Sequence, residues 1–187
     1  MSIIEDKADE ALGRRVRAER EGRGWSLAEL AGRAGVSKAM LSKIERAEAS
    51  PTAATLSRIA TAYGLTMAAL FEVAVGSSRL QRAKDQPVWR DPKAAYLRRQ
   101  VFLHPANPLE LVEVELPAGQ EAGFPASAYH LIRQVVWVIS GRLTLMEGVE
   151  CHELAAGDRV ELGPPSDIVF RNETAQPCRY LVAVVRR

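Results

Sequence analysis

The sequence predicts a multidomain chain in which an α-helical N-terminal domain is followed by an all-β C-terminal domain. Three observations support this prediction. Apolar residues recur at helical spacing before residue 75, a strongly basic segment without a sustained period follows, and short alternating segments broken by proline and glycine make up the rest. We therefore expect a five-helix domain over residues 1–74, a linker over 75–100 and a double-sheet β barrel over 101–187.

The composition is that of an ordinary globular protein. Of the 187 residues, 47% are hydrophobic and 26% are charged. No apolar run approaches the roughly 18 residues needed to cross a bilayer, and the acidic N-terminal segment is unlike a secretory signal, so we expect a cytoplasmic protein without a membrane partner. Cys151 and Cys178 lack metal-finger spacing, which favours reduced structural thiols, with a redox switch as the alternative.

The first, fourth and fifth expected helices are defined by periodicity and by their ends. Leu12 and Val16 follow helical spacing in the first helix, and Gly22 ends the pattern. Pro51 opens the fourth helix, because proline suits a first helical turn, and Gly64 ends it. A short fifth helix follows, which completes a compact unit near residue 74.

Two short helices that cross at a tight turn are expected after residue 25. Ser26 and Ser37 are good N-cap residues, and Gly35 between them can adopt the positive φ that the turn requires. Leu41 and Ile44 are three residues apart, so they face inward. The opposite face of the second helix then points outward, toward a DNA major groove in our interpretation.

The spacing of apolar and small residues in this segment resembles the phage-repressor-like (Xre-type) helix-turn-helix family. The residues that match are Leu27, Ala31, Gly35, Val36, Leu41 and Ile44. The resemblance implies a DNA-binding dimer that places two recognition helices in successive major grooves of a palindromic operator. It implies DNA contacts from Ser26, Ser37, Lys38, Ala39, Met40, Ser42 and Lys43.

These residues have different expected roles at the DNA. Lys38 and Lys43 can donate to guanine O6 and N7, and the serines can contact bases or phosphates. Ala39 and Met40 can meet a thymine methyl group, although Met40 can equally pack at the rim of the fourth helix. Leu27 stands where many family members carry glutamine, so a phosphate contact there must come from Ser26 or from backbone N–H groups.

The charge is distributed unevenly along the chain. Residues 1–75 hold 11 Lys/Arg against 10 Asp/Glu, residues 76–100 hold 7 against 2, and residues 101–187 hold 7 against 11. Basic side chains within or beside the helix-turn-helix unit predict a local attraction for phosphate. They are Arg14, Arg15, Arg17, Arg20, Lys38, Lys43 and Arg46.

The C-terminal part alternates in the manner of short antiparallel strands, from AYLRRQVFL at residue 95 to RYLVAVV at residue 179. Over residues 105 to 185 it resembles the cupin fold, a small double-sheet jelly roll. The match rests on turn residues that occur in the cupin order, namely Pro117, Gly119, Gly141, Gly157, Asp158 and Asn172.

The cupin resemblance implies a metal held by three histidines and a glutamate, but this chain departs from that pattern. Ala128, His130, Gln134 and Ile168 stand at the four ligand positions, and only one of them is a good donor. We therefore expect no metal and no cofactor. The barrel is instead expected to bind a small organic effector through His130, Gln134, Val136, Ile168 and Phe170. Alternatively, His130 and Gln134 satisfy each other within a packed core.

The strand around Trp137 is apolar on both faces, so something must cover its outer face. Trp137 and Ile139 are candidates for a homodimer interface, and packing against Trp89 of the linker is the alternative. The favoured function is a ligand-responsive transcriptional repressor that is not an enzyme. The alternatives are a metal-dependent cupin enzyme with an autoregulatory helix-turn-helix and an antitoxin-like interaction protein.

Overall fold

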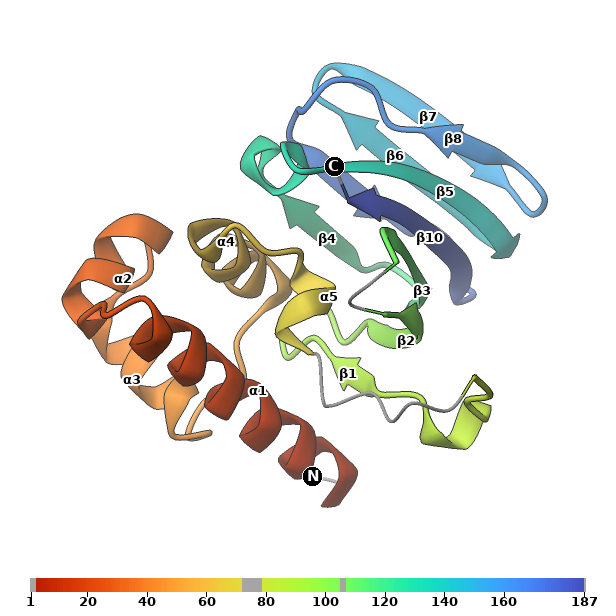
Figure 1. The fold of residues 1–187 in the computed structure, drawn as a ribbon. Coiled ribbons are helices and arrows are strands. Elements are labelled where there is room, and N and C mark those ends of the chain that lie inside the picture. The colour runs from red at the N-terminus through yellow and green to blue at the C-terminus, as the bar shows by residue number, and fades with distance from the viewer. Residues whose placement is uncertain (1–2, 72–78, 105–106, 187) are drawn as a thin grey trace.

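The computed structural model describes residues 3–71, 79–104 and 107–186. Its helices lie together on one side and its strands form two sheets on the other (Figure 1). Within the described residues the α-helices are α1 (Ile3–Gly22), α2 (Leu27–Ala34), α3 (Lys38–Glu45), α4 (Ala53–Tyr63) and α5 (Met67–Leu70). The five expected helices are therefore confirmed. No helix in the described ranges is long and apolar enough to span a membrane.

The helix ends follow the capping residues that the sequence contains. The Ser26 Oγ accepts from the Glu29 N–H at 3.1 Å while the Glu29 carboxylate accepts from the Ser26 N–H at 2.6 Å, which is a capping box. The Ser37 Oγ accepts from the Met40 N–H at 3.2 Å. Gly35 and Gly64 end their helices at φ 62° and 71°, in the left-handed region that glycine adopts without strain.

The helical core brings α1 very close to α3. Val16, Leu30 and Leu41 are fully buried between the helices. Gly13 on α1 lies against the backbone of α3, and a Cβ at this position would be 2.5 Å from the carbonyl oxygen of Ile44. Glycine is therefore needed at residue 13 for close approach.

The C-terminal part consists of two antiparallel sheets. Its strands are β1 (Val88–Arg90), β2 (Leu97–Leu103), β3 (Leu109–Leu116), β4 (Glu121–Phe124), β5 (Ile132–Ser140), β6 (Arg142–Glu147), β7 (Glu150–Ala155), β8 (Arg159–Glu161), β9 (Ile168–Arg171) and β10 (Cys178–Arg186). The 3₁₀ turn η1 (Ala83–Asp85) precedes β1, and a second, η2 (Ala126–Tyr129), lies between β4 and β5. One sheet has the order β1-β2-β3-β10-β5-β8 and the other β4-β9-β6-β7.

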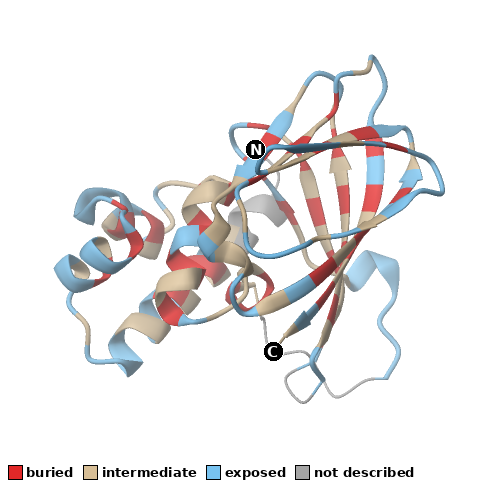
Figure 2. Cartoon of the chain, turned by 90° about the horizontal axis from the view of Figure 1, so that it is seen from above, coloured by how far each residue is buried: buried red, intermediate tan, exposed pale blue. Residues whose placement is uncertain are grey.

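The inner faces of the two sheets pack on each other to form the β core. Buried positions alternate along the strands and face the inside of this domain (Figure 2). Phe170 of β9 stacks on Tyr180 of β10 with ring centroids 5.5 Å apart, which joins the two sheets. Asn172 is fully buried, and its side-chain amide donates to the carbonyls of Leu116, Pro117 and Gln176. Asn172, a turn residue of the cupin-like pattern, therefore links the loop after Leu116 to the loop that contains Gln176.

The segment expected as a linker differs from that expectation. Val88–Arg90 and Leu97–Leu103 are strands of the larger sheet, so the expected boundary at residues 100/101 falls inside β2. Trp89 is only 4% exposed, and its ring contacts Phe71 at 5.5 Å and Tyr96 at 5.8 Å. The alternative packing of Trp137 against Trp89 is therefore wrong. The alternating segment AYLRRQVFL already indicated β2, whereas β1 has only three residues and directly follows Pro87, which is too short to show a pattern.

The helical part and the sheets are in direct contact. Helix α4 packs on β4 and η2, and α5 packs on β2. The buried Asp91 carboxylate accepts from the Ala53 N–H at 2.6 Å at the start of α4. Thr66, the N-cap of α5, donates to the buried carboxylate of Glu110 on β3. The orientation of the two parts is thus held by buried polar contacts as well as by apolar packing.

Candidate DNA-binding surface and interdomain cavity

Helix α3 presents the outward face that the sequence predicts. Leu41 and Ile44 are 0% and 2% exposed, while Lys38, Ala39 and Lys43 on the opposite face are exposed. Met40 is 40% exposed. Residues that are exposed, short or cationic at the N-terminal end of a recognition helix suit contact with base edges and phosphates.

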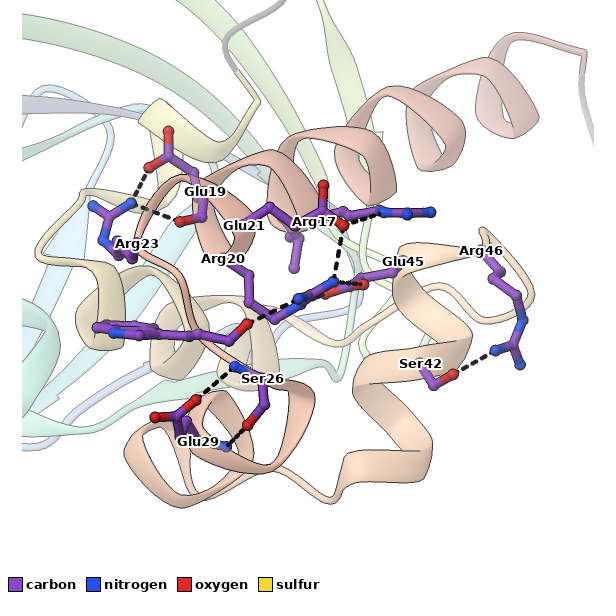
Figure 3. A network of polar contacts seen from close by, with 12 residues as sticks. Arg17, Glu19, Arg20, Glu21, Arg23, Ser26, Glu29, Ser42, Glu45 and Arg46 are labelled. Atoms are coloured by element: carbon purple, nitrogen blue, oxygen red, sulfur yellow. Dashed lines mark hydrogen bonds and ion pairs between the residues drawn. The ribbon is translucent and has the colours of Figure 1, made fainter.

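Three of the expected serine contacts are already engaged in the protein. Ser26 and Ser37 cap α2 and α3 through their hydroxyl oxygens. The Ser42 hydroxyl accepts a hydrogen bond from Arg46 (Figure 3). Arg46 also forms an ion pair with Glu48. A capping oxygen keeps its own O–H free to donate, so Ser26 and Ser37 can still donate to a phosphate. The roles of all seven expected DNA-contact residues stay predictions.

Most arginines of α1 are paired within the protein rather than facing outward alone. Arg20 donates to both carboxylate oxygens of Glu45 at 2.7 and 2.9 Å and to the Trp25 carbonyl at 2.9 Å (Figure 3). Its side chain is 12% exposed and that of Glu45 7%. The Glu45 carboxylate raises the pKa of the Arg20 guanidinium through this hydrogen bond. This buried pair positions α3 against α1, a role that sequence spacing did not indicate.

The surface arginines of α1 also have acidic neighbours. Arg15 pairs with Glu19 at 2.7 Å and Arg17 with Glu21 at 2.7 Å. In contrast, Lys38 and Lys43 form no ion pair within 4.0 Å in the parts of the chain that the structure describes. The expectation that the α1 arginines attract phosphate is weakened by their pairing, and the two lysines of α3 carry the cationic charge at the recognition face.

A cavity of about 120 Å³ lies between the helical part and the sheets. It is lined by α4, by the α4–α5 turn and α5, and by inward-facing residues of both sheets. The lining residues are Ser57, Ala60, Thr61, Leu65, Thr66, Met67, Ala68, Tyr96, Arg98, Glu110, Val112, Val114, Phe124, Ala128, Tyr129, Ile132, Gln134, Phe170, Tyr180, Val182 and Val184. A molecule in this cavity touches the DNA-binding domain and the β domain together.

The cavity includes only some of the residues expected to bind a ligand. Gln134 and Phe170 line it. Val136 and Ile168 face inward as expected, but they are 0% and 1% exposed and belong to the packed core outside the cavity. The expected inward position of His130 is wrong, because η2 carries the chain away from the sheet and His130 lies exposed at its end.

The polar residues of the cavity were missed by the sequence analysis. Arg98 and Glu110 are 5% and 1% exposed, although charged residues are seldom buried. Glu110 accepts from Thr66 at 2.9 Å and pairs with the Arg186 guanidinium at 3.4 Å. The alternating segment AYLRRQVFL was the sequence signal that bears on Arg98, and it crosses the expected linker boundary.

The residues at the four cupin ligand positions do not fit a metal ion. Ala128 and Ile168 have no donor atom, His130 is exposed, and Gln134 is a poor ligand for a transition metal. Within residues 3–71, 79–104 and 107–186, no group of three or more His, Cys, Asp or Glu side chains is placed to hold an ion.

Comparisons with known proteins agree with both parts of the fold. Residues 16–70 match a family model described as Helix-turn-helix. The chain is 30% identical over 162 residues to the HTH-type transcriptional regulator SutR of Escherichia coli (strain K12), covering 86% of each protein. The structure of an HTH_3 family transcriptional regulator from Vibrio cholerae matches with a TM-score of 0.79 and 23% identity, covering 98% of this chain and 99% of that one.

A third similar structure is the cupin domain of an XRE family transcriptional regulator from Enterobacter cloacae. It matches 50% of this chain and 98% of that domain with 18% identity and a TM-score of 0.46. The identity and coverage shared with the Escherichia coli regulator show the family. This chain belongs to the Xre-type helix-turn-helix transcriptional regulators, and its C-terminal part is a two-sheet β domain.

Proposed function

We propose that this regulator is a dimeric, cytoplasmic repressor whose affinity for a palindromic operator changes when a small molecule fills the interdomain cavity, without a metal. The observation that carries the proposal is the lining of the cavity. Ala60 of α4 and Met67 of α5 line it together with Val112 of β3 and Phe170 of β9. A ligand there contacts both domains, so it can favour one arrangement of them over another.

Such a ligand changes DNA binding only by its difference in affinity between two arrangements of the domains. The buried contacts of Asp91 with α4 and of Glu110 with the cap of α5 lie at the same interface. They fix the helical domain on the sheets in the state seen here. A second arrangement of the domains must break or replace these contacts. They are therefore the structural elements through which ligand binding is coupled to DNA binding in this proposal.

The DNA-binding half of the proposal rests on α3. Its N-terminal end presents Lys38, Ala39 and Met40, and Lys43 follows one turn later, all exposed. One such domain covers little DNA, so a dimer with half-sites roughly 34 Å apart, or a multiple of that distance, is needed for strong specificity.

The outer face of β5 is the proposed dimer surface. Trp137 and Ile139 are 48% and 39% exposed and lie two residues apart on one face of this strand. The Trp137 indole donates to the Gly157 carbonyl at 3.2 Å, so the ring is held in place on the surface. A second copy of the chain is the proposed cover, because an apolar ring held at the surface suits a self-complementary contact.

Binding-site selection on the full chain tests the DNA-binding proposal. We expect a palindromic consensus, and analytical centrifugation of the operator complex should show two chains per site. Trp137→Lys should shift the free protein toward monomer and weaken operator binding, whereas Val149→Lys, at a 98% exposed position in the turn between β6 and β7, serves as the control. A single asymmetric site bound by one chain would refute the dimer.

A thermal-shift screen of small molecules tests the sensor proposal. A ligand at a hundredfold excess over its Kd should stabilise the fold by about 2.7 kcal/mol. It should also change operator affinity in fluorescence anisotropy. Ala128→Leu, which adds volume at a lining position, should reduce the stabilisation. If every stabilising molecule leaves operator affinity unchanged, the cupin domain is not a sensor of this kind.

A further inference from the structure

Arg98 is a buried cation in the wall of the cavity. It is 5% exposed and lies on β2 beneath the end of α5, with its guanidinium carbon 5.2 Å from the centre of the Phe71 ring. Within the described part of the chain, Arg98 has neither a hydrogen bond nor an ion pair. A guanidinium carries five N–H donors, and leaving them unused in a buried site costs free energy.

The buried acid in the same cavity, Glu110, forms no ion pair with Arg98 among the contacts of the described residues. Glu110 also lines the cavity, but its carboxylate oxygens accept from the Thr66 hydroxyl at 2.9 and 3.1 Å, and Arg186 pairs with it at 3.4 Å. The charge of Glu110 raises the pKa of Arg98 through a coulombic effect. Burial lowers the pKa of Arg98 to about 10, so the side chain remains charged at neutral pH.

Tyr96 supplies a second unused donor close to Arg98. It is 3% exposed and lines the cavity, and its hydroxyl is buried without a hydrogen-bond partner in the described residues. Tyr96 and Arg98 are two positions apart on one chain segment, so both side chains face the same side. Both side chains line the same cavity, and burial raises the pKa of the Tyr96 hydroxyl, an effect that the charge of Arg98 partly offsets.

The rest of the cavity is largely apolar and small. Val112 and Val114 of β3 line it beside Arg98, and Phe124 and Phe170 line it from the other sheet. Its volume of about 120 Å³ is slightly below the roughly 150 Å³ of an engineered cavity that holds benzene. The site therefore has room for a molecule of about six non-hydrogen atoms.

From this arrangement we infer that the cavity binds a small organic monocarboxylate, with Arg98 and Tyr96 donating to the carboxylate and the apolar wall covering the rest of the molecule. This assignment rests on the proposed sensor function and specifies its ligand class. A carboxylate accepts two parallel N–H bonds from guanidinium, and it neutralises the buried charge in the same step. Because Arg98 contacts Phe71, the carboxylate binds next to the end of the helical domain.

The test uses calorimetric titration of the full chain with matched pairs of acids and amides at constant ionic strength. The panel comprises the sodium salts of acetic, propionic, butyric and valeric acids and the corresponding uncharged amides. We expect at least one acid to bind with one site per chain, and its amide to bind at least tenfold more weakly. Inorganic phosphate and sulfate should bind more weakly than that acid, since they leave the apolar wall uncovered.

Arg98→Met separates the charge from the packing. This substitution replaces the buried cation by an apolar chain of similar length, so the free protein should melt at the same temperature or higher. It should lose at least tenfold in affinity for the acid but not for the amide. Arg142→Met, at an exposed position on β6, is the control and should bind as the unaltered protein does.

Three results would overturn the assignment: no acid in the panel binds more tightly than its amide, Arg98→Met binds the acid unchanged, or phosphate or sulfate binds best. The sensor function is judged separately by operator affinity. Binding of an acid that leaves operator affinity unchanged supports the ligand class and contradicts the sensor function. A change in operator affinity caused by an uncharged molecule in Arg98→Met supports the sensor function and contradicts the ligand class.

Discussion

Replacing Arg20 by methionine tests the buried pair that holds α3 against α1. The substitution removes two hydrogen bonds to the Glu45 carboxylate, of 2.7 and 2.9 Å, and one to the Trp25 carbonyl. Glu45 is 7% exposed, so it is left as a buried charge without its partner. Two charge-assisted hydrogen bonds contribute roughly 1.5 to 3 kcal/mol each. Breaking a buried ion pair costs about 3 to 5 kcal/mol. Both estimates indicate that the substitution lowers the free energy of unfolding by about 4 kcal/mol.

Thermal and urea unfolding measure this loss. For a chain of this length, about 4 kcal/mol lowers the melting temperature by roughly 8 to 16 °C. The double variant Arg20→Met/Glu45→Leu should recover about 2 to 3 kcal/mol, because it leaves no charge buried. Arg17→Met breaks only an exposed pair with Glu21 and should leave the melting temperature unchanged. If the melting temperature of Arg20→Met differs from that of the unaltered protein by less than ~2 °C, the reasoning is refuted. A shift that small corresponds to a loss of less than about 1 kcal/mol.

Three further predictions concern DNA contact, close packing and thiol chemistry. Lys43→Ala should weaken operator binding several-fold and lower the log–log salt slope by about one unit if Lys43 meets a phosphate; unchanged affinity would exclude it from the interface. Gly13→Ala should destabilise the fold by about 1 to 3 kcal/mol in urea, since a Cβ there lies 2.5 Å from the Ile44 carbonyl oxygen, whereas a gain in stability would show that α1 and α3 can separate. Iodoacetamide at pH 8 should modify the exposed Cys151 before Cys178, whose pKa burial raises to about 11, as mass spectrometry can show; equal rates in the native state would contradict this.

The candidate site was predictable from sequence only where it depends on local rules. The outward position of Lys43 and the caps at Ser26 and Ser37 follow from spacing within a single helix. His130 was misplaced because counting along a strand assumes that the strand is continuous, and η2 interrupts it. Arg98 was missed because its burial results from α5 lying over β2, and no local pattern reports which helix covers which strand.

Taken alone, the sequence determined that the chain has a helix-turn-helix domain followed by a two-sheet cupin domain, since helical and strand periodicities and glycine turns are encoded within a few residues. It also determined that the usual cupin metal ligands are replaced, because residue identity suffices for that. Three features became visible only with the tertiary contacts: Val88–Arg90 pairs with β2, Arg20 pairs with Glu45, and the cavity lies between the domains. Within the described residues, Arg98 in its wall has no ion-pair partner. Each of these depends on contacts between residues far apart in the chain, whose partners are selected by packing and desolvation of the whole fold rather than by local sequence.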